Sequence, residues 1–69
     1  MKLDNRIKVL RAERDWTQQD LATRVGVTRK TINTVERGVF VPSTIVALKI
    51  ARSFGVPVED VFRLMPDAL

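Results

Sequence analysis

The segment VTRKTINTVERG, residues 27–38, gathers polar side chains on one face of a short predicted helix. Thr28 is a suitable N-cap and Gly38 a suitable stop. Ile32 and Val35 form an apolar stripe that must be buried. The opposite face then points outward and carries Arg29, Lys30, Asn33 and Thr34. No acid lies among these groups, so they could bind an anionic partner through charge and directed hydrogen bonds.

The net charge of +4 over 69 residues is unevenly distributed along the chain. Residues 1–40 contain nine Lys or Arg and five Asp or Glu, whereas residues 41–69 contain three of each kind. The positive excess therefore lies entirely in the part that includes the polar face. This distribution favours a polyanionic partner, and the alternative is a basic face that is simply solvated.

The lack of cysteine and histidine limits the chemistry available to this chain. It excludes a disulfide and argues against zinc. The acids are scattered over capping and helix-dipole positions, so no paired carboxylates or activated nucleophile indicate an enzyme. We expect no metal, cofactor or small-molecule ligand. Short apolar runs and an N-terminus, MKLDNRIKVL, without a signal-peptide core predict a cytoplasmic protein that does not bind membranes.

The pattern of caps, breakers and apolar spacing predicts an all-α fold of five helices without strands. The expected helices span about 5–14, 18–25, 29–37, 44–54 and 58–64, in a single domain over residues 1–69 with its core at about 4–64. Asp4, Thr17, Thr28 and Ser43 are the expected N-caps, and Pro57 opens the last helix. Asp20 adds a capping box to the second helix.

The second and third predicted helices are joined by only Gly26 and Val27. So short a link fits a helix-turn-helix, in which the two helices cross at about 90–120°. Gly26 supplies the positive φ that the turn needs. Ala22 suits a crossing that leaves space for a methyl group and little more.

The sequence resembles a known family across nearly its whole length. The stretch LRAERDWTQQDLATRVGVTRKTINTVERGVFVPSTIVALKIARSFGVPVEDVF is similar to the Cro-like, phage-repressor-type helix-turn-helix regulators of the XRE family. The matching features are TQQDLA, the glycine turn, TINTVERG, PS, LKIA and GVPVEDVF. The resemblance implies a compact bundle and a sequence-specific regulator of transcription, with a repressor expected, that is associated with the nucleoid when bound to DNA.

Within this resemblance the third helix reads the major groove of double-stranded DNA. Arg29 and Lys30 could donate to guanine, Asn33 could bond adenine, and Thr34 could touch a thymine methyl or a phosphate. Phosphate contacts are expected from Gln18, which family members use as a clamp, and from Thr17, Thr28 and Arg37. Arg11 and Glu36 match positions that form an ion pair in related repressors.

An apolar surplus predicts a homodimer through the last two helices and the C-terminal tail. Ile45, Leu48 and Ala51 would serve the protein's own core. The surplus residues expected to meet a second copy are Val46, Ile50, Leu64 and Leu69. Two copies would also multiply the selectivity of a short reading helix.

Two other classes of function remain open at this stage. A protein-interaction module, or an antitoxin-type protein of this same fold that binds a partner, would need an exposed apolar patch. RNA binding would need aromatic side chains interleaved with the basic residues, and the sequence offers no such platform.

Overall fold

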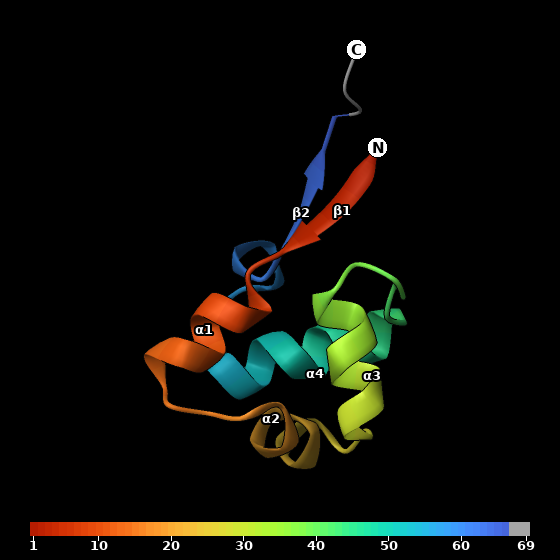
Figure 1. Ribbon diagram of the computed structural model, residues 1–69. Coiled ribbons are helices and arrows are strands. Elements are labelled where there is room, and N and C mark those ends of the chain that lie inside the picture. The colour runs from red at the N-terminus through yellow and green to blue at the C-terminus, as the bar shows by residue number, and fades with distance from the viewer. Residues whose placement is uncertain (67–69) are drawn as a thin grey trace.

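The computed structural model describes residues 1–66, which form four α-helices, a 3₁₀ turn and a two-stranded sheet (Figure 1). In chain order the elements are β1 (Lys2–Asn5), α1 (Ile7–Glu13), α2 (Gln18–Val25), α3 (Arg29–Glu36), α4 (Thr44–Phe54), the 3₁₀ turn η1 (Val58–Asp60) and β2 (Phe62–Met65). The helices pack into one body, from which the sheet projects with the N-terminus at its tip. The predicted all-α class is confirmed, but the predicted count of five helices is wrong.

The core is built from one apolar stripe of each helix and from the residue before β2. Its members are Ile7, Leu10, Leu21, Ala22, Val25, Ile32, Val35, Ile50, Ala51, Phe54 and Val61. The apolar stripe predicted for the third helix, Ile32 and Val35, is thus confirmed. Within residues 1–66 no polar or charged residue is buried as a whole, and no helix is long and apolar enough to cross a bilayer.

The predicted helix starts in the middle of the chain are confirmed by their hydrogen bonds. The Thr17 hydroxyl accepts from the Asp20 N–H at 3.0 Å, and the Asp20 carboxylate accepts from the Thr17 N–H at 2.9 Å. Thr28 and Ser43 cap α3 and α4 in the same way, each accepting from a backbone N–H three residues later. Side-chain oxygens therefore satisfy donors that the helix itself cannot pair.

The first helix begins later than predicted, because the residues before it form a strand. We predicted residues 5–14 with Asp4 as the N-cap, whereas α1 spans Ile7–Glu13 and Asp4 lies in β1. The side chain of Asn5 serves this helix start instead, since its Oδ1 accepts from the N–H of Ile7 at 3.1 Å.

The predicted helix over residues 58–64 is wrong. The chain makes one 3₁₀ turn there and then enters β2, which pairs antiparallel with β1. Leu3 lies opposite Leu64, and Asn5 lies opposite Phe62. The apolar residues of this stretch fit a helical period, but a strand partner at the other end of the sequence decides the outcome.

The face of α4 that was predicted to be free packs against the core. Ile50 is fully buried and Val46 packs partly buried against the core. Their prediction as interface residues is therefore wrong, because they complete the protein's own core. Ile45 and Leu48, predicted to be core residues, are 67% and 52% exposed. The buried stripe has a spacing of four residues and consists of Val46, Ile50 and Phe54. The predicted stripe had a spacing of three residues and began with Ile45 and Leu48.

The other two residues predicted to meet a second copy lie near the C-terminus. Leu64 in β2 is 64% exposed, so it is free of the protein's own core. Leu69 lies outside the described residues.

Candidate nucleic-acid interface

The link between α2 and α3 is a tight turn with a left-handed glycine. Gly26 has φ 84°, and the carbonyl of Ala22 accepts from the N–H groups of both Gly26 and Val27, at 2.8 and 3.0 Å. Ile32 and Val35, at 0% and 2% exposure, then seat α3 on the core. Because these two residues fix the rotation of α3 about its axis, the polar face must point outward.

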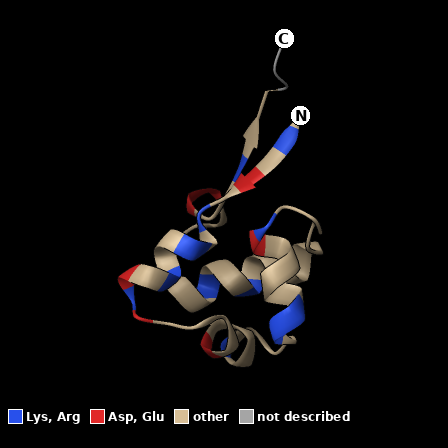
Figure 2. Cartoon of the chain, in the orientation of Figure 1, with Lys and Arg blue, Asp and Glu red and all other residues tan. Residues whose placement is uncertain are grey.

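The outward face of α3 carries the predicted readers at its N-terminal half, where Figure 2 shows a basic segment. Arg29 and Lys30 are exposed, whereas Asn33 and Thr34 are half-buried. Neither cation forms an ion pair with any residue in 1–66. Arg29, Lys30 and Asn33 line one shallow hollow of the surface. The structure thus brings these three predicted readers together on an open face.

Asn33 is tied to the neighbouring helix. Its Nδ2 donates to Oε1 of Gln18, the first residue of α2, at 3.4 Å. Gln18 also lines an open, shallow hollow together with Arg11, Thr17, Gln19 and Arg29. The predicted phosphate clamp and a predicted base reader are therefore coupled, a link that sequence spacing alone did not reveal.

The three threonines of the predicted site use their hydroxyl groups within the fold. Thr34 donates its hydroxyl to carbonyls of its own helix, at 3.1 Å to Lys30 and 3.0 Å to Thr31. Its hydroxyl is thus engaged, and its methyl group is the part suited to an apolar contact. Thr17 accepts a backbone N–H as an N-cap, which leaves its own hydroxyl hydrogen for another acceptor. Thr28 accepts the N–H of Thr31 in the same way, and its hydroxyl also forms a hydrogen bond of 3.0 Å with the Thr31 hydroxyl.

The start of α2 offers donors suited to an anion. The capping box pairs the N–H groups of Thr17 and Asp20, whereas those of Gln18 and Gln19 have no acceptor within residues 1–66. Unpaired N–H groups and the helix dipole favour a phosphate oxygen at such a position. The hydrogen bond from the Thr17 N–H lowers the pKa of the Asp20 carboxyl, so this cap stays ionised at neutral pH.

Arg11 and Glu36 form the ion pair that the resemblance implied. Nε and Nη2 of Arg11 donate to the two carboxylate oxygens of Glu36 at 2.7 and 3.0 Å, in a bidentate arrangement. Nη1 of Arg11 donates to the carbonyl of Trp16 at 2.9 Å. The two side chains are only 14% and 7% exposed. The pair therefore joins α1, the end of α3 and the loop that leads into α2.

Asn5 holds the same end of α3 and was missed by the sequence analysis. Its Nδ2 donates to the carbonyl of Val35 at 3.1 Å and lies 3.4 Å from that of Glu36. These carbonyls belong to the last turn of α3, where no backbone N–H group of the helix is available to donate to them. Arg37 follows, exposed and without an ion pair in residues 1–66.

An aromatic stack positions the start of α2 and was also missed. Trp16 stacks on Phe54 with ring centroids 5.5 Å apart. The guanidinium of Arg24, which lies on α2, is 4.0 Å from the centroid of the Trp16 ring. Arg14 donates to the carbonyl of Phe54 at 2.7 Å. Aromatic residues close to arginines in the sequence were the available signal.

This geometry agrees with what sequence comparison finds. The profile of the helix-turn-helix family matches residues 7–61. The chain therefore belongs to the helix-turn-helix family, whose members are DNA-binding regulators of transcription and not enzymes. Within this class it is of the XRE type, as the resemblance predicted.

Relatives occur in bacteria and archaea, and two of them are of similar length. The HTH-type transcriptional regulator YgzD of Bacillus subtilis is 45% identical over 62 residues, covering 90% of this chain and 94% of YgzD. MJ0272 of Methanocaldococcus jannaschii is 47% identical over 60 residues, covering 87% and 91% of the two chains. The phage CTXphi transcriptional repressor RstR of Vibrio cholerae is 34% identical over 56 residues, which cover 81% of this chain and half of RstR.

Solved structures share the fold. A putative DNA-binding protein from Bacteroides fragilis superposes with a TM-score of 0.78 at 30% identity, covering 88% of this chain and 98% of that one. The hypothetical transcription factor NHTF from Neisseria gives a TM-score of 0.73 at 26% identity, over 78% of this chain and 62% of NHTF.

Proposed function

We propose that this protein is a repressor that binds a specific duplex sequence as a homodimer, with α3 of each copy in the major groove. The observation that carries the proposal is the unpaired cationic start of α3, set beside the donor-rich start of α2. A helix fits the major groove with its first residues at the base edges, while the helix before it crosses the backbone. The similarity of this chain to the phage repressor RstR supports repression over activation.

Each polar group of the face has a proposed partner on DNA. Arg29 and Lys30 donate to N7 and O6 of guanine. One amide hydrogen of Asn33 is donated to Gln18. The other donates to N7 of adenine, and Oδ1 of Asn33 accepts from the adenine N6 group. The methyl group of Thr34 contacts a thymine methyl, since its hydroxyl is engaged within the helix.

Phosphate contacts set the register of the proposed complex. Gln18 binds one phosphate with its side chain and with the free N–H groups at the start of α2. The hydroxyls of Thr17 and Thr28 donate to the same strand, and Arg37 binds a phosphate farther along. Because the ligand is chromosomal DNA, the proposed site of action is the cytoplasm, at the nucleoid.

The proposal is tested by selecting duplexes from a random library and measuring affinity for the selected and a scrambled sequence across a salt series. Arg29→Ala/Lys30→Ala should lose selectivity, whereas Gln18→Ala should weaken both duplexes alike. Lys2→Ala/Lys8→Ala removes the same charge from exposed positions elsewhere and is the matched control. An Arg29→Ala/Lys30→Ala protein with undiminished selectivity would show that α3 is not the reader.

A further inference from the structure

We propose that a cavity at the base of the two-stranded sheet binds a small zwitterion, of the size and class of a free α-amino acid. The cavity has a volume of about 250 Å³ and lies where β1 and β2 meet the helical body. Four of its seven lining residues, Asp4, Asn5, Arg6 and Arg63, lie outside the segment 7–61 that matches the family profile. No small-molecule ligand was expected from the sequence, because these residues are brought together by the pairing of β1 with β2.

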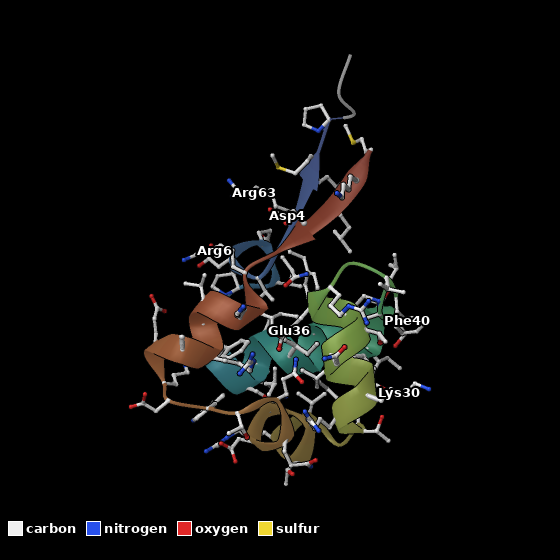
Figure 3. The ribbon with its side chains drawn as sticks, viewed as in Figure 1. Asp4, Arg6, Lys30, Glu36, Phe40 and Arg63 are labelled. Atoms are coloured by element: carbon white, nitrogen blue, oxygen red, sulfur yellow. The ribbon has the colours of Figure 1, made fainter. Side chains whose placement is uncertain are left out.

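The wall of the cavity has charges of both signs that do not pair with each other. Within residues 1–66 no ion pair or side-chain hydrogen bond joins any two of these groups. Asp4 and Arg63 lie opposite each other in the strand register, a position where opposite charges attract. Figure 3 shows them with Arg6 on one side of the sheet, away from Lys30 on α3. The charged lining residues, all exposed, are Asp4, Arg6, Glu59, Asp60 and Arg63.

This set of groups fits a ligand with one carboxylate and one ammonium group. The guanidinium groups of Arg6 and Arg63 suit a carboxylate, to which arginine can donate two parallel hydrogen bonds. The three carboxylates of the wall accept from an ammonium group and disfavour a purely anionic ligand. The cavity volume of about 250 Å³ lies below the roughly 300–1,000 Å³ that hold drug-sized ligands. A free α-amino acid combines both charges in a molecule of this small size.

The backbone around the cavity is fixed by the fold. The N–H of Arg6 donates to the carbonyl of Val61 at 2.9 Å, which joins the start of α1 to the end of η1. Val61 itself is buried in the core. The pairing of β1 with β2 fixes the position of Arg63 relative to Asp4. Because the backbone is already in place, only side chains need to be ordered when a ligand binds.

Asn5 connects the cavity with α3. It lines the cavity, its Nδ2 donates to the carbonyl of Val35 at 3.1 Å, and its Oδ1 accepts from the N–H of Ile7 at 3.1 Å. A ligand that fixes this end of β1 therefore also fixes the C-terminal end of α3. We expect an occupied cavity to strengthen binding of the selected duplex, and DNA to raise the affinity for the ligand by the same factor. This second step rests on the proposed function, whereas binding of the ligand does not.

The site is tested by titrating the isotope-labelled full chain with each of the common L-α-amino acids and recording its NMR spectrum. At least one of them should shift the amide signals of residues 4–6 and 59–63 in a saturable way. Arg6→Gln/Arg63→Gln should bind it about 10-fold more weakly, because charged hydrogen-bond donors are lost. Lys2→Gln/Lys8→Gln removes the same charge from exposed positions that do not line the cavity and is the matched control.

Two results would overturn the site. The first is the absence of a saturable shift with every amino acid, and the second is an equal loss of affinity in the two double variants. All four substituted positions are exposed, so both variants should fold, and an unchanged unfolding midpoint establishes this.

Blocked derivatives of the bound amino acid test the class of ligand. The N-acetyl derivative lacks the ammonium group and the amide derivative lacks the carboxylate, so each should bind more weakly than the free amino acid. Equal binding of either derivative would overturn the zwitterionic ligand.

The affinity for the selected duplex tests the step from the cavity to α3. Anisotropy titration of the wild type should show about five-fold tighter binding at a saturating concentration of the amino acid, and no change for Arg6→Gln/Arg63→Gln. An unchanged affinity of the wild type would overturn the coupling through Asn5. A wild type that selects no duplex would overturn the proposed function and this step with it, while the NMR titration decides the ligand site independently.

Discussion

The two ends of α3 differ sharply in how they are held. At its N-terminal half, Arg29 and Lys30 reach into solvent without an ion pair in residues 1–66, and one long hydrogen bond joins Asn33 to α2. At its C-terminal end, Glu36 forms a bidentate pair with Arg11 and the last carbonyls accept from Asn5. The helix is thus fastened at one end and open at the other.

This difference separates positioning from contact. A backbone held at its far end keeps the angle of the helix constant, so the cost of ordering on DNA falls mainly on the side chains that make the contact. Mutations at the fastened end should therefore act first on stability, and those at the open end on affinity.

The largest expected effect is at the fastened end, in the Arg11–Glu36 pair. Glu36→Ala leaves the largely buried guanidinium of Arg11 without its carboxylate, which should lower the free energy of unfolding by about 3 kcal/mol. Urea denaturation measures this loss. Glu13→Ala is the control, because Glu13 is 58% exposed and lies 3.7 Å from Arg14; its removal should cost less than about 0.5 kcal/mol. Equal losses for the two variants would contradict the fastening role.

At the open end the expected pattern is reversed. Arg29→Ala or Lys30→Ala should weaken binding to the selected duplex by about 1–3 kcal/mol each if the side chain contacts a guanine. The free energy of unfolding should change by less than about 0.5 kcal/mol, as for other surface positions. Anisotropy titration and urea denaturation on the same samples give both quantities. If these variants lose as much free energy of unfolding as free energy of binding, the two ends of α3 do not differ in role.

Asn5 should show a moderate loss of stability. Asn5→Ala removes both the acceptor for the N–H of Ile7 and the donor to the Val35 carbonyl. We expect about 1–2 kcal/mol from these two part-buried bonds. Thermal unfolding measures it, and Asn33→Ala at the open end is the paired comparison, with a smaller expected loss. If Asn33→Ala proves the more costly of the two, α3 is held mainly through α2.

The sequence predicted the fold well where its signals are local. From Thr17 to Gly55 each helix has a capping side chain or a terminal glycine, and the structure has those helices within a residue or so of the prediction. Both ends of the chain were predicted wrongly, since the pairing of β1 with β2 joins segments that no local window contains. For α4, two apolar stripes fit the same helix equally well, and only the packing of the other helices selects the one with Ile50.

In the candidate site, too, local features could be predicted from the sequence and tertiary contacts could not. The outward direction of Arg29 and Lys30 followed from the spacing of Ile32 and Val35, which is a local property of one helix. The hydrogen bond between Gln18 and Asn33 and the anchoring of α3 by Asn5 depend on tertiary distances, so spacing could not reveal them. The exposed polar face of α3 was thus easier to predict than the residues that hold this helix in place.

The smallest expected effect lies in the capping box of α2, at the edge of the open end, and it depends on pH. The pKa of Asp20 is lowered in the folded protein, chiefly by the hydrogen bond from the Thr17 N–H. Its stabilising contribution is therefore complete above the pKa of the unfolded chain and is lost as pH falls through the lower folded value. Asp20→Asn should be less stable than the wild type at about pH 7, and this difference should shrink toward about pH 3. Thermal unfolding at both pH values measures it. Thr28→Ala, which removes a cap without a carboxylate, should keep the same deficit at both. A deficit of Asp20→Asn that does not change with pH would mean that the geometry of the cap, and not its charge, stabilises the start of α2.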